Sequence, residues 1–180
     1  MELSFLYAIP RTPALDSFFL AVTRMTGSIG QLWLIVAALL LAFKRTRKAG
    51  VAVLISYLGV LLFGQLILKH LVSRPRPCQV DPTFALLLER PSGSSFPSTH
   101  SAWSFAAATA IFMFNRKGGA VAFVAAALIA FSRLYLFVHF PTDVLFGVAL
   151  GMALGVAASR LSTPLMQKLQ CGAQDPAAEN

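Results

Sequence analysis

Five long stretches of apolar residues follow one another along the chain, separated by short polar segments. They run over residues 25–43, 49–68, 98–114, 118–132 and 144–159, and the fourth extends towards residue 138. Each is close to the roughly 20 residues that an α-helix needs to cross the hydrocarbon core of a bilayer. Backbone polar groups inside lipid have to be satisfied within their own segment, which favours helices. The pattern therefore predicts an all-α, polytopic transmembrane helical bundle with about five spans.

Residues 5–25 are largely apolar as well, but Pro10 and Pro13 and the charged residues Arg11, Asp16 and Arg24 interrupt them. A secretory signal would place its positive charges before the apolar core and a small-residue cleavage site after it, and neither is found here. We therefore predict an amphipathic segment lying at the membrane interface over residues 1–24, rather than a sixth span. Residues 25–168 then form one membrane domain, and residues 169–180 are predicted to be a disordered cytoplasmic tail.

The composition agrees with a membrane protein, since 57% of the 180 residues are hydrophobic and only 12% are charged. The net charge of +8 comes largely from basic residues that follow the first, third and fifth stretches. They are Lys44, Arg45, Arg47, Lys48, Arg116, Lys117, Arg160 and Lys168. Because successive spans alternate in direction, all of these residues lie on one side, which the positive-inside rule makes cytoplasmic. The charge therefore reflects topology, and we expect no nucleic-acid binding.

The opposite ends of the helices carry the unusual polar residues. The second stretch ends in "LKHLVSRPRP", the third begins with "FPSTHS", the fourth ends in "SRLYLFVHF" and the fifth begins with "PTDVLFG". By parity these four segments meet at the extracytoplasmic surface, and ionisable groups at membrane depth indicate a functional site. The residues brought together are Lys69, Arg74, Arg76, Ser98, Thr99, His100, Ser132, Arg133, His139 and Asp143.

This set of side chains suits a phosphate ester. Cationic side chains, with the amides of Ser98 and Thr99 at a helix start, would hold a phosphoryl group and stabilise the charge on its oxygens. Two histidines supply a nucleophile and a proton donor. Asp143, four residues after His139, is placed to accept a hydrogen bond from one ring nitrogen, which leaves the other nitrogen free to attack. The sequence shows no metal-ligand cluster, so we expect no cofactor.

Three motifs along the chain carry a resemblance to a known family. They are Lys69-x6-Arg76-Pro77, then Pro97-Ser98-Thr99-His100, then Ser132-Arg133-x5-His139-x3-Asp143. In this order, over roughly residues 50–160, they resemble the signature of the type-2 phosphatidic acid phosphatase family. The resemblance implies a helical-bundle lipid phosphatase that needs no metal and passes through a phosphohistidine.

Carried over by position, the resemblance makes His139 the nucleophile, Asp143 its orienting partner and His100 the acid that protonates the leaving oxygen. The phosphate would be bound by Lys69, Arg76, Arg133, Ser98 and the amide of Thr99. The chain departs from the family in two respects, because Thr99 stands where the family usually has glycine and because the first of six spans is lacking. The role of Arg74 stays open, and His70 is interpreted as an interfacial packing residue.

By analogy with the family, and because the predicted site faces outward, the favoured substrate is undecaprenyl diphosphate, with phosphatidate and phosphatidylglycerol phosphate as alternatives. A phosphotransferase that passes the phosphoryl group to an alcohol would use the same residues. A phosphate-binding transporter would explain the cations, but it leaves unexplained the two histidines and the aspartate placed behind one of them. The predicted partner is thus a lipid phosphate in the membrane.

Overall fold

The computed structural model describes residues 1–28 and 30–172. Within this part of the chain, all regular secondary structure is helical and no strand is found. The elements are α1 (Glu2–Tyr7), α2 (Pro13–Thr26), α3 (Gln31–Ala42), α4 (Arg47–Gly59), the π-helix η1 (Val60–Leu68), α5 (Lys69–Val72), α6 (Pro77–Val80), α7 (Thr99–Phe114), α8 (Arg116–Tyr135) and α9 (Pro141–Gly172). The prediction of an all-α fold is confirmed. Helix α9 continues to Gly172, and the rest of the predicted tail, residues 173–180, lies outside the described residues.

Three segments are long and apolar enough to cross a membrane: Arg47–Val80, Arg116–Tyr135 and Pro141–Lys168. Helices α2 and α3 satisfy the same criterion only together, as a pair bent by 54°. The first predicted stretch, residues 25–43, is therefore divided, because a turn with positive φ at Gly27 and Gly30 separates the two helices. Helix α7 has only 16 residues, which is short for a span.

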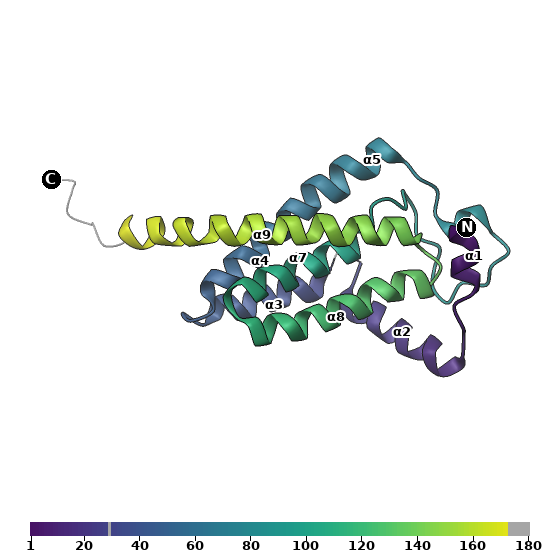
Figure 1. The fold of residues 1–180 in the computed structure, drawn as a ribbon, viewed down its shortest axis with the longest axis horizontal. Coiled ribbons are helices and arrows are strands. Elements are labelled where there is room, and N and C mark those ends of the chain that lie inside the picture. Colours follow the sequence, from purple (N-terminus) through teal and green to yellow (C-terminus); the bar gives the residue numbers. More distant parts are fainter. Residues whose placement is uncertain (29, 173–180) are drawn as a thin grey trace.

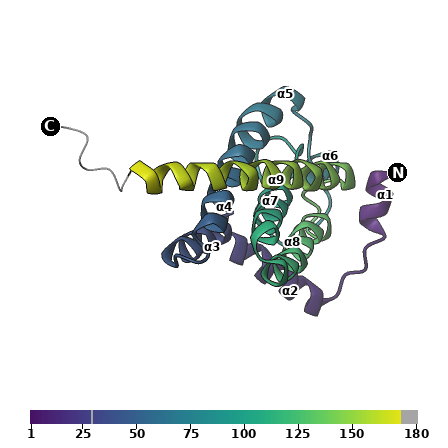
Figure 2. The ribbon, with the colours of Figure 1, turned by 60° about the vertical axis from the view of Figure 1, so that its left-hand side comes forward.

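Helix α7 lies at the centre of the bundle, between α8 and α9 and against α4 (Figures 1 and 2). Most of its residues are buried, and many of them are alanines that let neighbouring helices approach closely. Its Trp103 stacks on the ring of Tyr57 with 5.2 Å between centroids, and Trp33 of α3 donates to the hydroxyl of Ser104 at 2.9 Å. A small-residue helix in the middle thus fixes the spacing of its neighbours.

The stripe of glycines on α9 faces α7. A Cβ atom added at Gly147 would lie 2.5 Å from the carbonyl oxygen of Ser98, and one at Gly151 would lie 2.3 Å from that of Ala102. Both distances are far below van der Waals contact, so only glycine allows this approach of backbone to backbone. The approach places the start of α9 directly beside the start of α7.

We expect Gly151→Leu to destabilise the protein by about 3 kcal/mol or more, because the added side chain meets the backbone of α7 and the helices have to separate. The change is measured as a fall in the apparent melting temperature in detergent. Ala153→Leu, on an exposed face of the same helix, is the matched control and should change the melting temperature little. Equal effects of the two changes would contradict the packing described above.

The two ends of the bundle differ in character. The turns between α3 and α4 and between α7 and α8 lie at one end, where the predicted basic residues are found (Figure 1). The end of α5, the start of α7, the end of α8 and the start of α9 lie at the other, together with α1 and α6 (Figures 1 and 2). The motif residues therefore share the end that parity predicted.

Candidate active site

The four motif-bearing chain segments are tied to one another by hydrogen bonds at this end of the bundle. The amide of Ser98, before α7, donates to the carbonyl of Asp143 in α9 at 3.1 Å. Ser95, three residues earlier, accepts from the ring of His139, which lies between α8 and α9. Arg74 and Arg76, which follow α5, reach Asp143 and His139 respectively. The structure thus brings three separated motifs into one site.

His139 is held in a single tautomer. Its Nδ1 lies 2.7 Å from the carbonyl oxygen of Ser95, and since a carbonyl only accepts, Nδ1 carries the proton. Its Nε2 then carries a lone pair and accepts from Nη1 of Arg76 at 3.3 Å. The residue is 3% exposed. One nitrogen is therefore used for orientation, and the other keeps a lone pair that faces Arg76.

Asp143 supports His139 less directly than the sequence predicted. Its Oδ2 lies 3.9 Å from Nδ1 of His139, and it accepts instead from the hydroxyl of Ser95 at 2.5 Å and from the amide of Phe140 at 2.9 Å. The predicted hydrogen bond from ring to carboxylate is replaced by the carbonyl of Ser95. Asp143 fixes Ser95 and the loop of His139, and its negative charge stays close to the imidazole.

Burial and nearby cations keep His139 uncharged. Removal from water lowers the pKa of His139 well below its ordinary value, and Arg76, Arg133, His100 and Lys69 lower it further. These four residues act on the pKa because they surround the ring. An imidazole that is neutral at pH 7 has an available lone pair, so this environment suits a nucleophile.

Arg76 is buried and binds several backbone carbonyls. It donates to Val138 from Nη1 at 3.1 Å and to Gly93 from Nε at 3.2 Å, and its own amide donates to the side chain of Gln79 at 2.8 Å. These bonds hold a positive charge against Nε2 of His139, at the position where a phosphoryl group would have to lie.

The helix α2 and the turn after it complete the site on the other side. Arg133, which is buried, donates to the hydroxyls of Ser132 and of Thr23 in α2. His100 lies 2.9 Å from the carbonyl oxygen of Gly27 through Nε2, so Nε2 carries a proton and Nδ1 is left for proton exchange. Residues 1–24, predicted as an interfacial segment, thus extend into the site through Thr23.

The start of α7 provides less than the sequence predicted. The amide of Ser98 is engaged with the carbonyl of Asp143, so it is not available to an anion, and the hydroxyl of Ser98 pairs with that of Ser101 at 2.9 Å. Thr99 is the first helical residue, and the helix itself offers its amide no partner. Thr99 begins the helix and has no positive φ, so its backbone does not require the glycine that the family usually has there.

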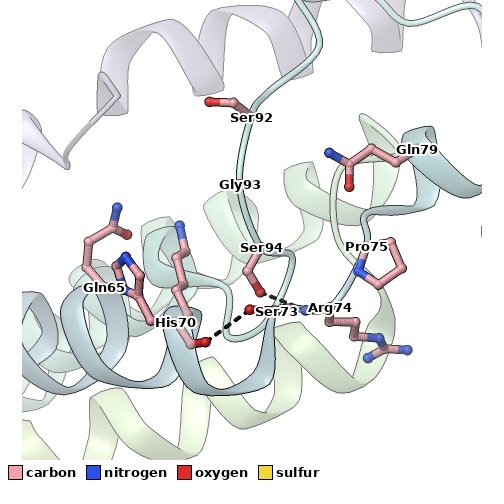
Figure 3. Close-up of a pocket in the computed structure, with 10 residues that line it drawn as sticks. Gln65, His70, Ser73, Arg74, Pro75, Gln79, Ser92, Gly93 and Ser94 are labelled. Carbon is pink, nitrogen blue, oxygen red and sulfur yellow. Dashed lines mark hydrogen bonds between the residues drawn. The ribbon is translucent and has the colours of Figure 1, made fainter.

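A cavity of about 610 Å³ opens beside the site (Figure 3). Most of the residues that line it are polar: they are Gln65, Lys69, His70, Ser73, Arg74, Pro75, Gln79, Ser92, Gly93 and Ser94. Lys69 belongs both to this cavity and to the residues that lower the pKa of His139. The side chain of Arg74 points away from the other lining residues in Figure 3. The cavity therefore leads from the protein surface to Lys69, which is one of the charged residues near His139.

Several site residues carry no signal in the sequence motifs. Ser95, Thr23 and Gly27 contact His139, Arg133 and His100, and Glu2 pairs with Arg74. Of these residues, only Gly27 stands out in the sequence, because Gly27 and Gly30 interrupt an apolar stretch. Within residues 1–28 and 30–172, the structure shows no group of three or more His, Cys, Asp or Glu residues arranged to hold a metal ion.

Two curated relatives each match about two thirds of this chain. An undecaprenyl-diphosphatase of Sulfolobus acidocaldarius is 36% identical over 121 residues, which cover 66% of this chain and 58% of that protein. The match thus spans less than two thirds of that relative. A decaprenylphosphoryl-5-phosphoribose phosphatase of Mycobacterium tuberculosis is 37% identical over 128 residues, which cover 68% of this chain and 67% of the relative.

Two solved structures have the same arrangement of helices. The crystal structure of Aquifex aeolicus LpxE matches with a TM-score of 0.70 and 27% identity, covering 88% of this chain and 92% of that one. A PAP2-type phosphatidylglycerolphosphate phosphatase from Bacillus subtilis matches with a TM-score of 0.68 and 27% identity, covering 88% and 82%. The sequence model that describes the PAP2 superfamily matches residues 48–167 of this chain, which contain all three motifs. The chain therefore belongs to the PAP2 superfamily.

Proposed function

We propose that the protein is an integral membrane phosphatase that hydrolyses a lipid phosphate or diphosphate through a phosphohistidine intermediate. The observation that carries the proposal is the state of His139: Nδ1 is fixed on the carbonyl of Ser95, and the lone pair of Nε2 faces Arg76. Membership of a superfamily whose relatives are named as phosphatases supports the reaction type.

In the first step, Nε2 of His139 forms a bond to phosphorus as the bond from phosphorus to the leaving oxygen breaks. Before this attack, the hydrogen bond from Arg76 to Nε2 of His139 has to be replaced by one from Arg76 to a phosphoryl oxygen. Arg133, Lys69, the hydroxyl of Ser98 and the amide of Thr99 bind the remaining oxygens. The negative charge of Asp143 stabilises the positive charge that develops on the ring.

His100 protonates the leaving oxygen. Since Nε2 of His100 is occupied by the carbonyl of Gly27, the proton is delivered from Nδ1, and the ring has to be an imidazolium when substrate binds. In the second step the neutral Nδ1 takes a proton from water, whose oxygen bonds to phosphorus as the bond to His139 breaks. Inorganic phosphate leaves, and both histidines return to their starting states.

We place the site at the extracytoplasmic face of a bundle of about five spans. The basic residues at the opposite end support this orientation by the positive-inside rule. Helix α7 is counted as a span because it is enclosed by α4, α8 and α9, so it needs no contact with lipid along its whole length. The bent pair α2 and α3 provides the remaining crossing.

Undecaprenyl diphosphate is the favoured substrate, since a relative named as an undecaprenyl-diphosphatase is 36% identical. The names of the other relatives and structures keep a phosphatidylglycerol phosphate and an isoprenoid-linked phosphosugar as alternatives. The purified protein, in detergent, is tested for phosphate release from these lipids and from phosphatidate. Phosphate release from none of them would contradict the proposal and would favour a phosphate-binding transporter.

We expect chelators to leave this activity unchanged, because cationic side chains provide the charge stabilisation that a metal supplies elsewhere. The test compares initial rates with and without a chelator. Loss of activity on chelation, with rescue by a divalent ion, would contradict the mechanism. A second assay adds a large excess of an alcohol acceptor, where transfer of phosphate to the alcohol in preference to water would identify a phosphotransferase.

The lowered pKa of His139 predicts how phosphoenzyme formation depends on pH. An imidazole with the ordinary pKa would be neutral in only about a quarter of molecules at pH 6. Because the pKa of His139 lies well below that value, the lone pair stays available, and the rate of phosphorylation should not fall between pH 7.5 and 6. An activated aryl phosphate is used in a rapid-quench experiment, since its leaving group needs no proton. A fourfold fall would contradict the prediction.

A further inference from the structure

The N-terminal helix α1 is connected to the active site through Arg74, whose role the sequence left open. Arg74 donates from Nη1 to Oδ1 of Asp143 at 2.7 Å and from Nη2 to the carboxylate of Glu2. Its guanidinium also lies over the ring of Phe140, 4.2 Å from the centroid. Arg74 thus stands between two carboxylates, one on α1 and one directly behind His139.

Glu2 binds the first turn of α9 as well as Arg74. Its Oε1 accepts from the amide of Thr142 at 3.1 Å and from the hydroxyl of Thr142 at 2.7 Å. Amides in the first turn of a helix have no partner within the helix, and a carboxylate there is stabilised by the helix dipole. Partial burial raises the pKa of Glu2, but hydrogen bonds from Thr142 and Arg74 outweigh it and keep the pKa below its ordinary value. Glu2 is therefore charged at neutral pH.

Apolar contacts hold α1 on the loop that carries His139. Leu6 is buried in a cluster with Cys78, Phe137 and Phe140. The ring of Tyr7 lies 5.4 Å from that of Phe137, and its hydroxyl donates to Asp81. Helix α1 therefore covers residues 136–140 from outside, and Glu2 is the part of it that reaches the charged groups.

We propose that Glu2 and Arg74 are positioning residues for phosphoryl transfer, with Glu2 acting through Arg74 on Asp143 and so on the presentation of His139. This inference rests on the proposed phosphatase function. The Asp143 carboxylate is shared among Arg74, the hydroxyl of Ser95 and the amide of Phe140.

Glu2 balances the charge of Arg74. Without Glu2, the guanidinium has Asp143 as its only carboxylate partner among the described residues. Its positive charge then offsets that of Asp143 more fully, so Asp143 stabilises the imidazolium on His139 less well. The Asp143 carboxylate is also drawn towards Arg74, which weakens its hydrogen bond with the hydroxyl of Ser95 and so the alignment of Ser95 with the ring of His139. The effect falls on the chemical step, because neither Glu2 nor Arg74 is among the groups proposed to bind the phosphoryl oxygens.

The test combines Glu2→Gln, Arg74→Gln and the double variant in a protein tagged at the C-terminus. Glutamine still accepts from Thr142 through its one carbonyl oxygen, so Glu2→Gln removes the charge and the bond from Arg74 but keeps the contact with α9. We expect Glu2→Gln to lower kcat about tenfold with KM unchanged within about twofold. Because Glu2 acts through Arg74, the double variant should match Arg74→Gln alone within about twofold.

The matched control is Tyr7→Phe, which removes a hydrogen bond of the same helix to Asp81 but leaves Arg74 and its partners intact. It should retain the kcat of the unmodified protein. Three results would each overturn the proposal: losses in kcat that multiply in the double variant, a change in KM alone, or an equal loss of kcat in Tyr7→Phe. Each would mean that these residues only support the fold.

A second measurement needs no substrate. Hydrogen exchange is followed in detergent for peptides covering residues 140–146, and Glu2→Ala should raise their exchange at least about fivefold relative to Tyr7→Phe. If the unmodified protein hydrolyses no lipid phosphate but exchange rises as expected, the proposed function fails and the link from α1 to α9 stands. If hydrolysis is found and both kcat and exchange are unaffected by Glu2 changes, the inference is overturned.

Discussion

His139→Ala is expected to abolish phosphate release, with a loss of turnover of at least about 10⁴-fold. The lone pair on Nε2 of His139 lies among Arg76, Arg133 and Lys69, and His100, the other histidine beside it, is engaged with Gly27 through its Nε2. Without His139, phosphorus has no nucleophile on the protein. The comparison is made with purified proteins on the best lipid phosphate from the substrate panel.

The loss has to be separated from misfolding and from weak binding. His139→Ala should keep an apparent melting temperature close to that of the unmodified protein, and it should still bind the substrate. Rapid quenching of the unmodified enzyme should trap an acid-labile, base-stable phosphoprotein whose phosphate maps to the peptide containing His139. Retention of more than a few per cent of turnover by the variant would remove His139 from the role of nucleophile.

His100→Ala is expected to distinguish between leaving groups. An isoprenoid alkoxide needs a proton as it departs, so hydrolysis of a lipid monophosphate should fall by about 10³-fold, within the range typical of a lost general acid. A nitrophenolate leaves as a stable anion at neutral pH, so an aryl phosphate should still phosphorylate His139. The diphosphate of a lipid lies between these cases, because its leaving phosphate needs protonation only weakly.

The same variant should accumulate the phosphoenzyme, because His100 also activates the water that hydrolyses it. A rapid-quench experiment with the aryl substrate should show a burst of phenolate close to one equivalent, followed by a slow phase, whereas the unmodified protein should show little burst. Equal losses with both substrates and no burst would mean that His100 only binds the phosphate.

The part of the site that lies in the motifs was predictable because helices alternate in direction. Hydropathy located the apolar stretches, and parity then put Lys69, His100, Arg133 and His139 at one end of the bundle, where the structure has them. Two local features of the fold differ from the predicted apolar stretches. The π-helix from Val60 to Leu68 and the break after Thr26 arise from packing and from glycine conformations that hydropathy does not report.

The contacts that orient the catalytic groups were not predictable in this way. Ser95 acts through its backbone carbonyl, which every residue type has, so no side-chain pattern marks it. Glu2 and Arg74 are 72 residues apart, and Thr23 and Arg133 are 110 apart. Such pairings depend on the final fold, whereas spacing rules describe neighbours along one helix.

The bond between Arg76 and His139 has a consequence for chemical selectivity. The guanidinium of Arg76 covers Nε2 of His139, the nitrogen proposed as the nucleophile, so a molecule reaches that nitrogen only by giving Arg76 a better acceptor. A phosphate offers charged oxygens in the geometry that arginine prefers. The carboxylic esters of membrane lipids, which surround the protein in great excess, offer only neutral carbonyls and leave the guanidinium where it is. Under the proposed mechanism, the residue that binds the substrate thus also protects the histidine from acylation by the lipids of the bilayer.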